Sequence, residues 1–206
     1  MLSAGRRPRV VLVVFCLALW LPGLFALPPG DRDESRFAQA TKQMVETGDY
    51  VRIMNGAEAR NRKPIGIHWL QAPFALAARA AGVAGGNPIW PYRVPSVLGG
   101  LLAVLATHAL GRRLAGERAG LLAGMMLGAS VLLAVEVHIA KTDAALLGAT
   151  TLAMGVLGRA YLGERVGAGE AAVFWLAVGA GVLLKGPITP MVAGLCVVVL
   201  LAWDRA

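Results

Sequence analysis

The apolar run VVLVVFCLALWLPGLFAL (residues 10–27), followed by the polar segment DRDESRFA (residues 31–38), decides the fold of this chain. The run approaches the ~20 residues that a helix needs to cross a ~30 Å hydrocarbon core. The polar segment places Asp33 and Glu34 where that helix leaves the membrane, and the loop continues to Lys63. An acidic pair at a membrane rim, with a basic residue later in the loop, indicates a site for chemistry between a lipid phosphate and a polar acceptor.

The composition is too apolar for a soluble domain of 206 residues. Hydrophobic residues make up 57% and charged residues 16%, with a mean hydropathy of +0.63. The 26 glycines suit membrane helices that pack closely through small residues. The net charge of +8 comes mainly from arginines beside apolar runs, so no nucleic-acid partner is expected. Cys16 and Cys196 both lie within apolar runs, which favours core packing over a disulfide or metal site.

Further apolar runs recur along the chain and predict an all-α integral membrane protein. Together with the first run they cover residues 10–27, 94–114, 119–135, 144–161, 171–184 and 188–203. No segment shows the alternation of a strand, and only helices then satisfy the backbone in lipid. The basic N-terminus also fits a secretory signal peptide, but the cleavage site near residue 26 is poor, which favours an uncleaved first helix.

The arginines predict which side of the membrane each loop occupies. With the basic N-terminus in the cytoplasm, Arg112, Arg113, Arg118, Arg165 and Arg205 also lie inside, as the positive-inside rule requires. The protein is then a multi-pass protein of the plasma (inner) membrane. The same parity puts three polar clusters outside: the loop of residues 28–93, residues 136–143 and residues 185–187.

The outer loop is predicted to hold two helices. Asp31 is a suitable N-cap with Glu34 three positions later in a capping box, and Gly48 is a C-terminal stop. Pro64 fits the first turn of a second helix, which runs through residues 67–78 along the membrane interface.

The helical period assigns different directions to the two acids of the first loop helix. Phe37, Ala40 and Met44 lie four, seven and eleven positions after Asp33, so the four share one face. Asp33 is therefore predicted to turn towards the protein. Glu34 lies about 100° round the helix and is predicted to face solvent or to cap.

These segments resemble a known family in order. RDESRFA (residues 32–38), with Met44 and GDY (48–50), resembles the first-loop signature of membrane-embedded polyprenyl-phosphate sugar transferases. This superfamily contains the protein O-mannosyltransferases and the aminoarabinose (lipid A) transferases, glycosyltransferase families 39 and 83, with the GT-C fold. KPIGIHWL (63–70), RVPS (93–96), KTD (141–143) and LKGP (184–187) resemble its later motifs.

The resemblance runs from about residue 28 to residue 187 and implies a GT-C-like bundle of several spans, with interfacial helices in the outer loop (28–93). The family is normally longer. Residues 1–206 are therefore expected to be the N-terminal part of its membrane domain, without the remainder, and inactive alone.

The resemblance also assigns roles to single residues. Asp33 would be the catalytic carboxylate, which accepts the proton of the acceptor hydroxyl or orients the acceptor, and Asp143 would be a second acid that orients the loop helix or contacts the acceptor. A salt bridge between Asp143 and a loop base such as Lys141 is an equally good interpretation. Three basic residues would hold the donor phosphate, with snorkelling towards headgroups as the alternative: Lys63, Arg93 and Lys185. Five further residues would support them: Glu34, Arg36, His68, His138 and Lys141.

No metal or cofactor is predicted. Glu136, His138, Asp143 and Asp33 together could bind a divalent ion, but no spacing demands one, and His138 is more often a packed interfacial histidine. Arg62 stands before Lys63, where members of the lipid A branch can carry an acid.

The function expected from these features is transfer of a sugar from a polyprenyl-phosphate carrier to a lipid (lipid A-like) or protein acceptor on the outer face. A multi-span transporter or flippase and a non-catalytic scaffold are the alternatives. Transporters place such charges near the middle of the bilayer, whereas here they collect at one rim.

Overall fold

The computed structural model describes residues 7–60 and 63–204 and confirms the predicted all-α fold. One small antiparallel hairpin interrupts the helices, with Met54 opposite Ala59. The elements in chain order are α1 (Arg7–Ala26), α2 (Arg32–Thr47), β1 (Met54–Asn55), β2 (Glu58–Ala59), α3 (Gly66–Ala80), the 3-10 turn η1 (Val83–Gly86), α4 (Trp90–Gly128), α5 (Val131–Val137), α6 (Asp143–Tyr161), α7 (Ala168–Lys185) and α8 (Ile188–Asp204).

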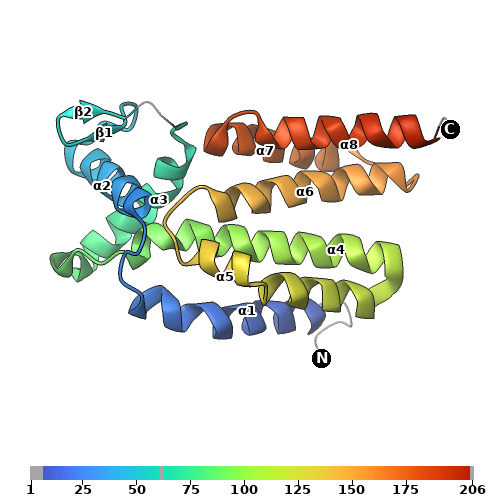
Figure 1. Ribbon diagram of the computed structural model, residues 1–206, viewed down its shortest axis with the longest axis horizontal. Coiled ribbons are helices and arrows are strands. Elements are labelled where there is room, and N and C mark those ends of the chain that lie inside the picture. Colours follow the sequence, from blue (N-terminus) through green and yellow to red (C-terminus); the bar gives the residue numbers. More distant parts are fainter. Residues whose placement is uncertain (1–6, 61–62, 205–206) are drawn as a thin grey trace.

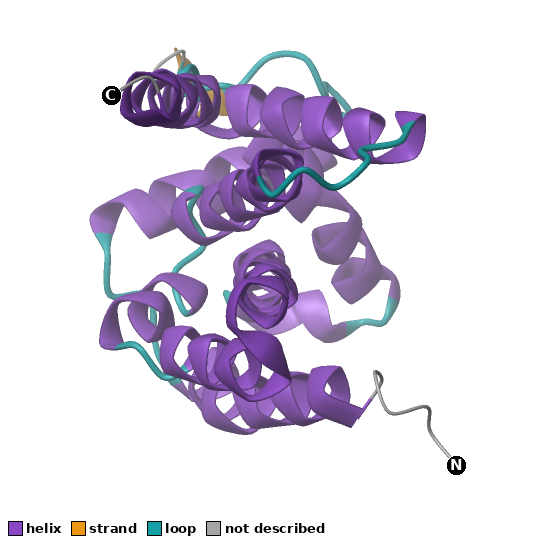
Figure 2. Cartoon of the chain, turned by 90° about the vertical axis from the view of Figure 1, so that its right-hand side faces the viewer, coloured by secondary structure: helices purple, strands orange, loops and turns teal. Residues whose placement is uncertain are grey.

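The long helices stack side by side in the order α1, α4, α6 and then α7 with α8 (Figure 1). The hairpin, α2 and α3 gather at one end of this stack, which we call the loop end; it also carries Lys185. The opposite end carries the turn at Gly116 and residues 162–167, and Figure 2 views the molecule from that side. The bundle therefore has two separate ends with different loops.

Four helices in the described part of the chain are long and apolar enough to cross a membrane: α1, α4, α6 and α7. The last helix, α8, is also apolar but has only 17 residues. The predicted run 94–114 lies unbroken within α4, whereas the predicted run 119–135 is interrupted. Assigned as one helix, α4 doubles back at Gly116, and the second run is divided between the end of α4 and α5.

Two local signals explain that arrangement. Gly116 has φ 87° and ψ 170°, a backbone conformation that residues other than glycine rarely adopt. The chain turns back along the bundle at this residue. Ser130 then ends the continuous helix, because its hydroxyl accepts a hydrogen bond from the Leu133 N–H and caps α5. The apolar runs predicted a break between residues 114 and 119, but not the break at Ser130.

The bundle core forms where α1, α4 and α5 meet around Trp20, Val104 and Val137, all fully buried. The Trp20 indole donates a hydrogen bond to the Gly128 carbonyl at 3.2 Å. Next to this core α4 packs on α6 through Gly99 and Gly148, where a Cβ on either residue would overlap the facing backbone. Such small-residue contacts let membrane helices approach closely.

The ends of the loop helices follow part of the prediction. Asp31 caps α2, and Gly48 ends it in the left-handed conformation. The predicted capping box is wrong, because Glu34 has other partners. The placement of Pro64 is also wrong: α3 begins at Gly66, with Ile65 as the residue before it.

Candidate functional site

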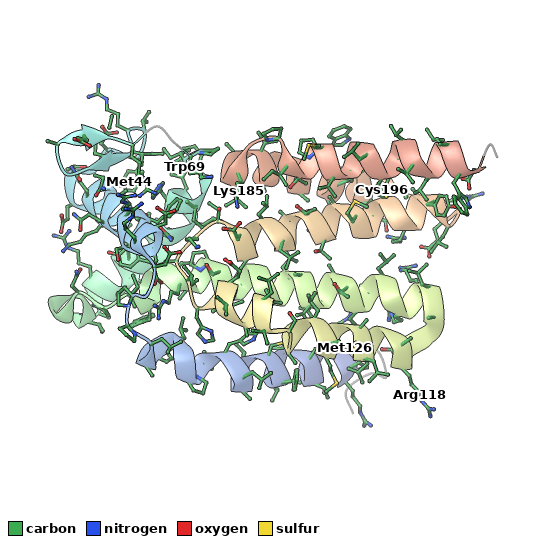
Figure 3. The ribbon with its side chains drawn as sticks, viewed as in Figure 1. Met44, Trp69, Arg118, Met126, Lys185 and Cys196 are labelled. Atoms are coloured by element: carbon green, nitrogen blue, oxygen red, sulfur yellow. The ribbon has the colours of Figure 1, made fainter. Side chains whose placement is uncertain are left out.

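The structure brings the three predicted polar clusters together at the loop end of the bundle. Lys141 donates a hydrogen bond to Asp31 at 2.7 Å, which joins the second cluster to the start of α2. Gly66 of α3 packs against the backbone of Leu183, close to the end of α7. Figure 3 shows Lys185 at that end of α7, beside the loop helices. Residues more than a hundred positions apart therefore form one polar region.

The predicted directions of Asp33 and Glu34 are wrong. The Asp33 side chain is 56% exposed, whereas that of Glu34 is 1% exposed. The prediction used only the apolar neighbours on α2 and assumed that the acid in line with them would face inward. A buried carboxylate needs a charged or hydrogen-bonding partner, and the structure provides that partner to Glu34.

That partner is Arg93, near the start of α4. Its Nε donates to Glu34 Oε1 at 2.7 Å and its Nη2 to Glu34 Oε2 at 3.1 Å, a two-pronged contact in which both side chains are 1% exposed. The remaining N–H groups donate to the carbonyls of Leu24, Leu27 and Pro28. We call this set the Glu34–Arg93 centre.

The Glu34–Arg93 centre leaves Arg93 no unused N–H group for the donor phosphate that the sequence predicted it to hold. An arginine has five N–H donors, and all five are engaged inside the protein. Snorkelling towards headgroups is excluded for the same reason. Glu34 Oε1 also accepts from the Ala140 N–H at 3.0 Å, so the centre connects α1, α2, α4 and the loop before Asp143.

Asp33 borders a cavity of about 410 Å³ that also receives Lys63. The structure thus brings together two residues that the sequence assigned to one site. The Asp33 carboxylate lies 3.6 Å from an Arg36 nitrogen and 3.9 Å from an Arg60 nitrogen. We call this the Asp33 cavity; its other lining residues are Phe37, Asn55, Glu58 and Ala59.

Sequence reasoning missed Arg60. Its guanidinium lies over the Phe37 ring, 4.5 Å from the centroid, and it reaches the cavity from the strand β2 side of the hairpin. The signal was weak, since one arginine among several in a polar loop indicates nothing without the hairpin that turns it back onto α2.

Asp143 forms an ion pair with Lys185 at the end of α7. The sequence had left the salt-bridge partner of Asp143 open, and it is Lys185 rather than Lys141. Lys141 pairs with Asp31 instead, and this hydrogen bond lowers the pKa of Asp31. Glu136 lies beside both pairs. Burial, followed by the charge of Asp143, raises the pKa of Glu136.

The two histidines predicted as supporting residues contact other groups of the protein. Buried His68 lies 2.7 Å from the Thr41 hydroxyl, which also lies 2.6 Å from Gln71 Oε1. Burial, with the charge of Arg60, lowers the pKa of His68 to about 4. The ring nitrogens of His138 lie 2.6 Å from the Ala134 carbonyl and 2.8 Å from that of Trp20, within the packing of α1 and α5.

The side chains that the sequence offered as metal ligands are not gathered. Among residues 7–60 and 63–204, no three His, Cys, Asp or Glu side chains form a group that could hold a metal ion. Arg62, which bears on the metal analogy, lies outside the described residues.

The chain is similar to known proteins both in sequence and in structure. Residues 62–206 match the sequence model of the family described as dolichyl-phosphate-mannose-protein mannosyltransferase. No curated protein sequence matches the chain. Two crystal structures of ArnT from Cupriavidus metallidurans are similar to it. The apo structure is 26% identical with a TM-score of 0.82, and the structure bound to undecaprenyl phosphate is 25% identical with the same TM-score.

The matches include almost all of this chain but only part of each ArnT chain. They cover 99% and 98% of this chain, but only 37% and 36% of the ArnT chains. This chain therefore spans a little over a third of the length of the structures that it resembles, with the multi-span GT-C arrangement in common.

Proposed function

Because the chain belongs to the dolichyl-phosphate-mannose-protein mannosyltransferase family, whose members are membrane glycosyltransferases, we propose that its loop end is a glycosyl-transfer site. The donor is a polyprenyl-phosphate sugar and the acceptor is a lipid or protein hydroxyl on the outer face of the membrane. The undecaprenyl phosphate in the similar ArnT crystal structure supports a polyprenyl-phosphate ligand here. The N-terminus lies in the cytoplasm in this arrangement.

The observation that carries the proposal is the meeting of Asp33 and Lys63 at one cavity of about 410 Å³. The acceptor oxygen forms a bond to the anomeric carbon as the bond from that carbon to the phosphate oxygen breaks, with inversion of configuration. Asp33 receives the proton of the acceptor hydroxyl. The electron pair of the broken bond leaves with the polyprenyl phosphate, whose charge Lys63 stabilises.

Arg36 and Arg60 complete this arrangement, and both lie near the same oxygen, Oδ1, of the Asp33 carboxylate. Neither ion pair is as short as a direct charged hydrogen bond, so the carboxylate oxygens keep room for an acceptor hydroxyl. The two arginines hold Asp33 at the cavity without occupying it fully.

The Asp143–Lys185 pair is the second part of the proposed site. Lys185 supplies a further positive charge for the donor phosphate, and Asp143 orients the acceptor while it holds Lys185 in place. The position of this pair supports these roles. Both residues lie at the loop end, where Lys141 joins the loop before Asp143 to the start of α2.

The test is transfer activity of Asp33→Asn in the complete protein, measured with a radiolabelled polyprenyl-phosphate sugar in isolated membranes. Asparagine keeps the shape of the side chain but accepts no proton, so we expect transfer to fall ~100-fold or more. Glu46→Gln is the matched control, because it removes an exposed carboxylate from the same helix, away from the Asp33 cavity. Both variants should insert normally. Near-normal transfer by Asp33→Asn would exclude Asp33 as the base.

A further inference from the structure

A second charged cavity lies at the opposite end of the bundle, far along α4, α6 and α7 from the Asp33 cavity. Its volume is about 260 Å³. Four arginines stand at its rim: Arg9 of α1, Arg112 and Arg113 of α4, and Arg159 of α6. One carboxylate, that of Glu170 of α7, also lines the cavity. The walls between the helices are apolar and include Leu110, Leu152, Val156 and Val173.

The rim carries more positive charge than its partners neutralise. Arg113 and Arg159 share Glu164, with nitrogen–oxygen distances of 2.6 and 2.8 Å, and Arg159 also pairs with Glu170. Arg112 lies 3.8 Å from Glu117. Arg9 has no ion pair among those of the described residues. The four guanidinium groups thus meet three carboxylates, and Arg9 and Arg112 are the least engaged.

The wall of the cavity is open where it passes Gly155 of α6. A Cβ placed on Gly155 would meet no heavy atom within 4 Å, so the groove there is not filled by a neighbouring helix. Apolar walls of this kind take a hydrocarbon chain, while the guanidinium groups at the rim suit a phosphate.

We propose that this cavity binds an anionic phospholipid of the bilayer. The phosphate diester lies between Arg9 and Arg112, and one acyl chain follows the apolar groove past Gly155. Basic pockets between membrane helices on the cytoplasmic side recognise anionic headgroups in this way, and the arginine distribution predicts that this end faces the cytoplasm. The site is separate from the proposed donor site, which lies at the loop end.

The experiment uses the complete chain purified in detergent and native mass spectrometry of the lipids that it retains. Phosphatidylglycerol is added against an equal amount of phosphatidylcholine. We expect preferential retention of phosphatidylglycerol, and roughly tenfold weaker retention by the double variant Arg9→Gln, Arg112→Gln. Inorganic phosphate at millimolar concentration should not displace the lipid, because it gains nothing from the apolar groove.

Two further variants separate a built site from diffuse surface charge. Gly155→Leu fills the groove without changing any charge and should reduce retention as strongly as the double variant. Arg118→Gln removes a positive charge from the same end, where the side chain points away from the bundle (Figure 3), and should leave retention unchanged.

The proposal is overturned if the double variant retains phosphatidylglycerol like the native chain, or if Arg118→Gln weakens retention equally. Displacement by inorganic phosphate would also overturn it, because the ligand would then be a free anion. Lipid retention is compared only among variants whose thermal stability in detergent equals that of the native chain. Because Asp33 lies at the other end, loss of this lipid site leaves the glycosyl-transfer proposal standing, and the reverse also holds.

Discussion

Asp33 and Glu34 are neighbours in the sequence, yet they belong to two opposite kinds of environment. The Glu34–Arg93 centre is dry, and every N–H of its arginine is used. The Asp33 cavity is open, and its carboxylate meets two arginines only at 3.6 and 3.9 Å. A saturated ion pair positions helices, whereas a partly engaged carboxylate at a cavity can exchange a proton with a substrate. Two neighbouring acids on one turn of helix thus differ in burial and in how fully their charge is paired.

The largest effect on stability is expected when Arg93 is removed from the Glu34–Arg93 centre. Arg93→Met leaves the Glu34 carboxylate buried without its charged partner, which should lower the free energy of unfolding by about 3–5 kcal/mol. Thermal unfolding in detergent measures the loss. Asp33→Asn is the control and should change stability by no more than about 0.5 kcal/mol. Equal effects of the two variants would show that the two environments are not distinct.

His68 extends the comparison to pH. Its pKa is lowered to about 4 in the fold, against about 6.5 when unfolded, so the neutral form is favoured by folding. The stability from this group is complete above pH 6.5 and is lost as pH falls towards 4, by about 3 kcal/mol in total. Amide exchange of α2 and α3 at pH 7 and pH 4.5 should reveal the loss.

His68→Asn is the matched variant, because its amide can still donate to Thr41 but does not titrate in this range. The variant should be less sensitive to acid than the native chain. If both lose protection equally between pH 7 and pH 4.5, other groups cause the effect.

The smallest effect is expected at the Asp31–Lys141 pair, which is partly exposed. The pKa of Asp31 is lowered in the fold, so the stability from this pair is present above the ordinary pKa of an aspartate and is lost as pH falls below it. Lys141→Gln should therefore cost no more than about 1 kcal/mol at pH 7. A cost near that of Arg93→Met would mean that the exposed pair also acts as scaffold.

Sequence reasoning succeeded where the signal is local. Asp31 and Gly48 carry their cap chemistry in their own side chain and backbone, and both cap α2. It failed where the outcome depends on a distant partner. Glu34 is turned inward by Arg93, fifty-nine positions later, which no periodicity on α2 contains. Arg60 reaches the Asp33 cavity only because the hairpin folds back.

The apolar runs show an intermediate case. Their mean hydropathy predicted helices, and helices occupy those segments. The gap between the runs 94–114 and 119–135 already placed a break around Gly116, but no break was predicted at Ser130, because one serine barely changes the average over a run of about twenty residues.

The sequence by itself determined that the chain is a bundle of apolar helices, and the order of its polar motifs determined its family. Hydrophobicity is a property of each residue and adds up along a local run, so it can be read without coordinates. Only the tertiary structure decided which acid faces the Asp33 cavity, which arginine is saturated and which lysine pairs with Asp143. The free energy of a charge depends on what surrounds it, and those surroundings come from parts of the chain far apart in sequence.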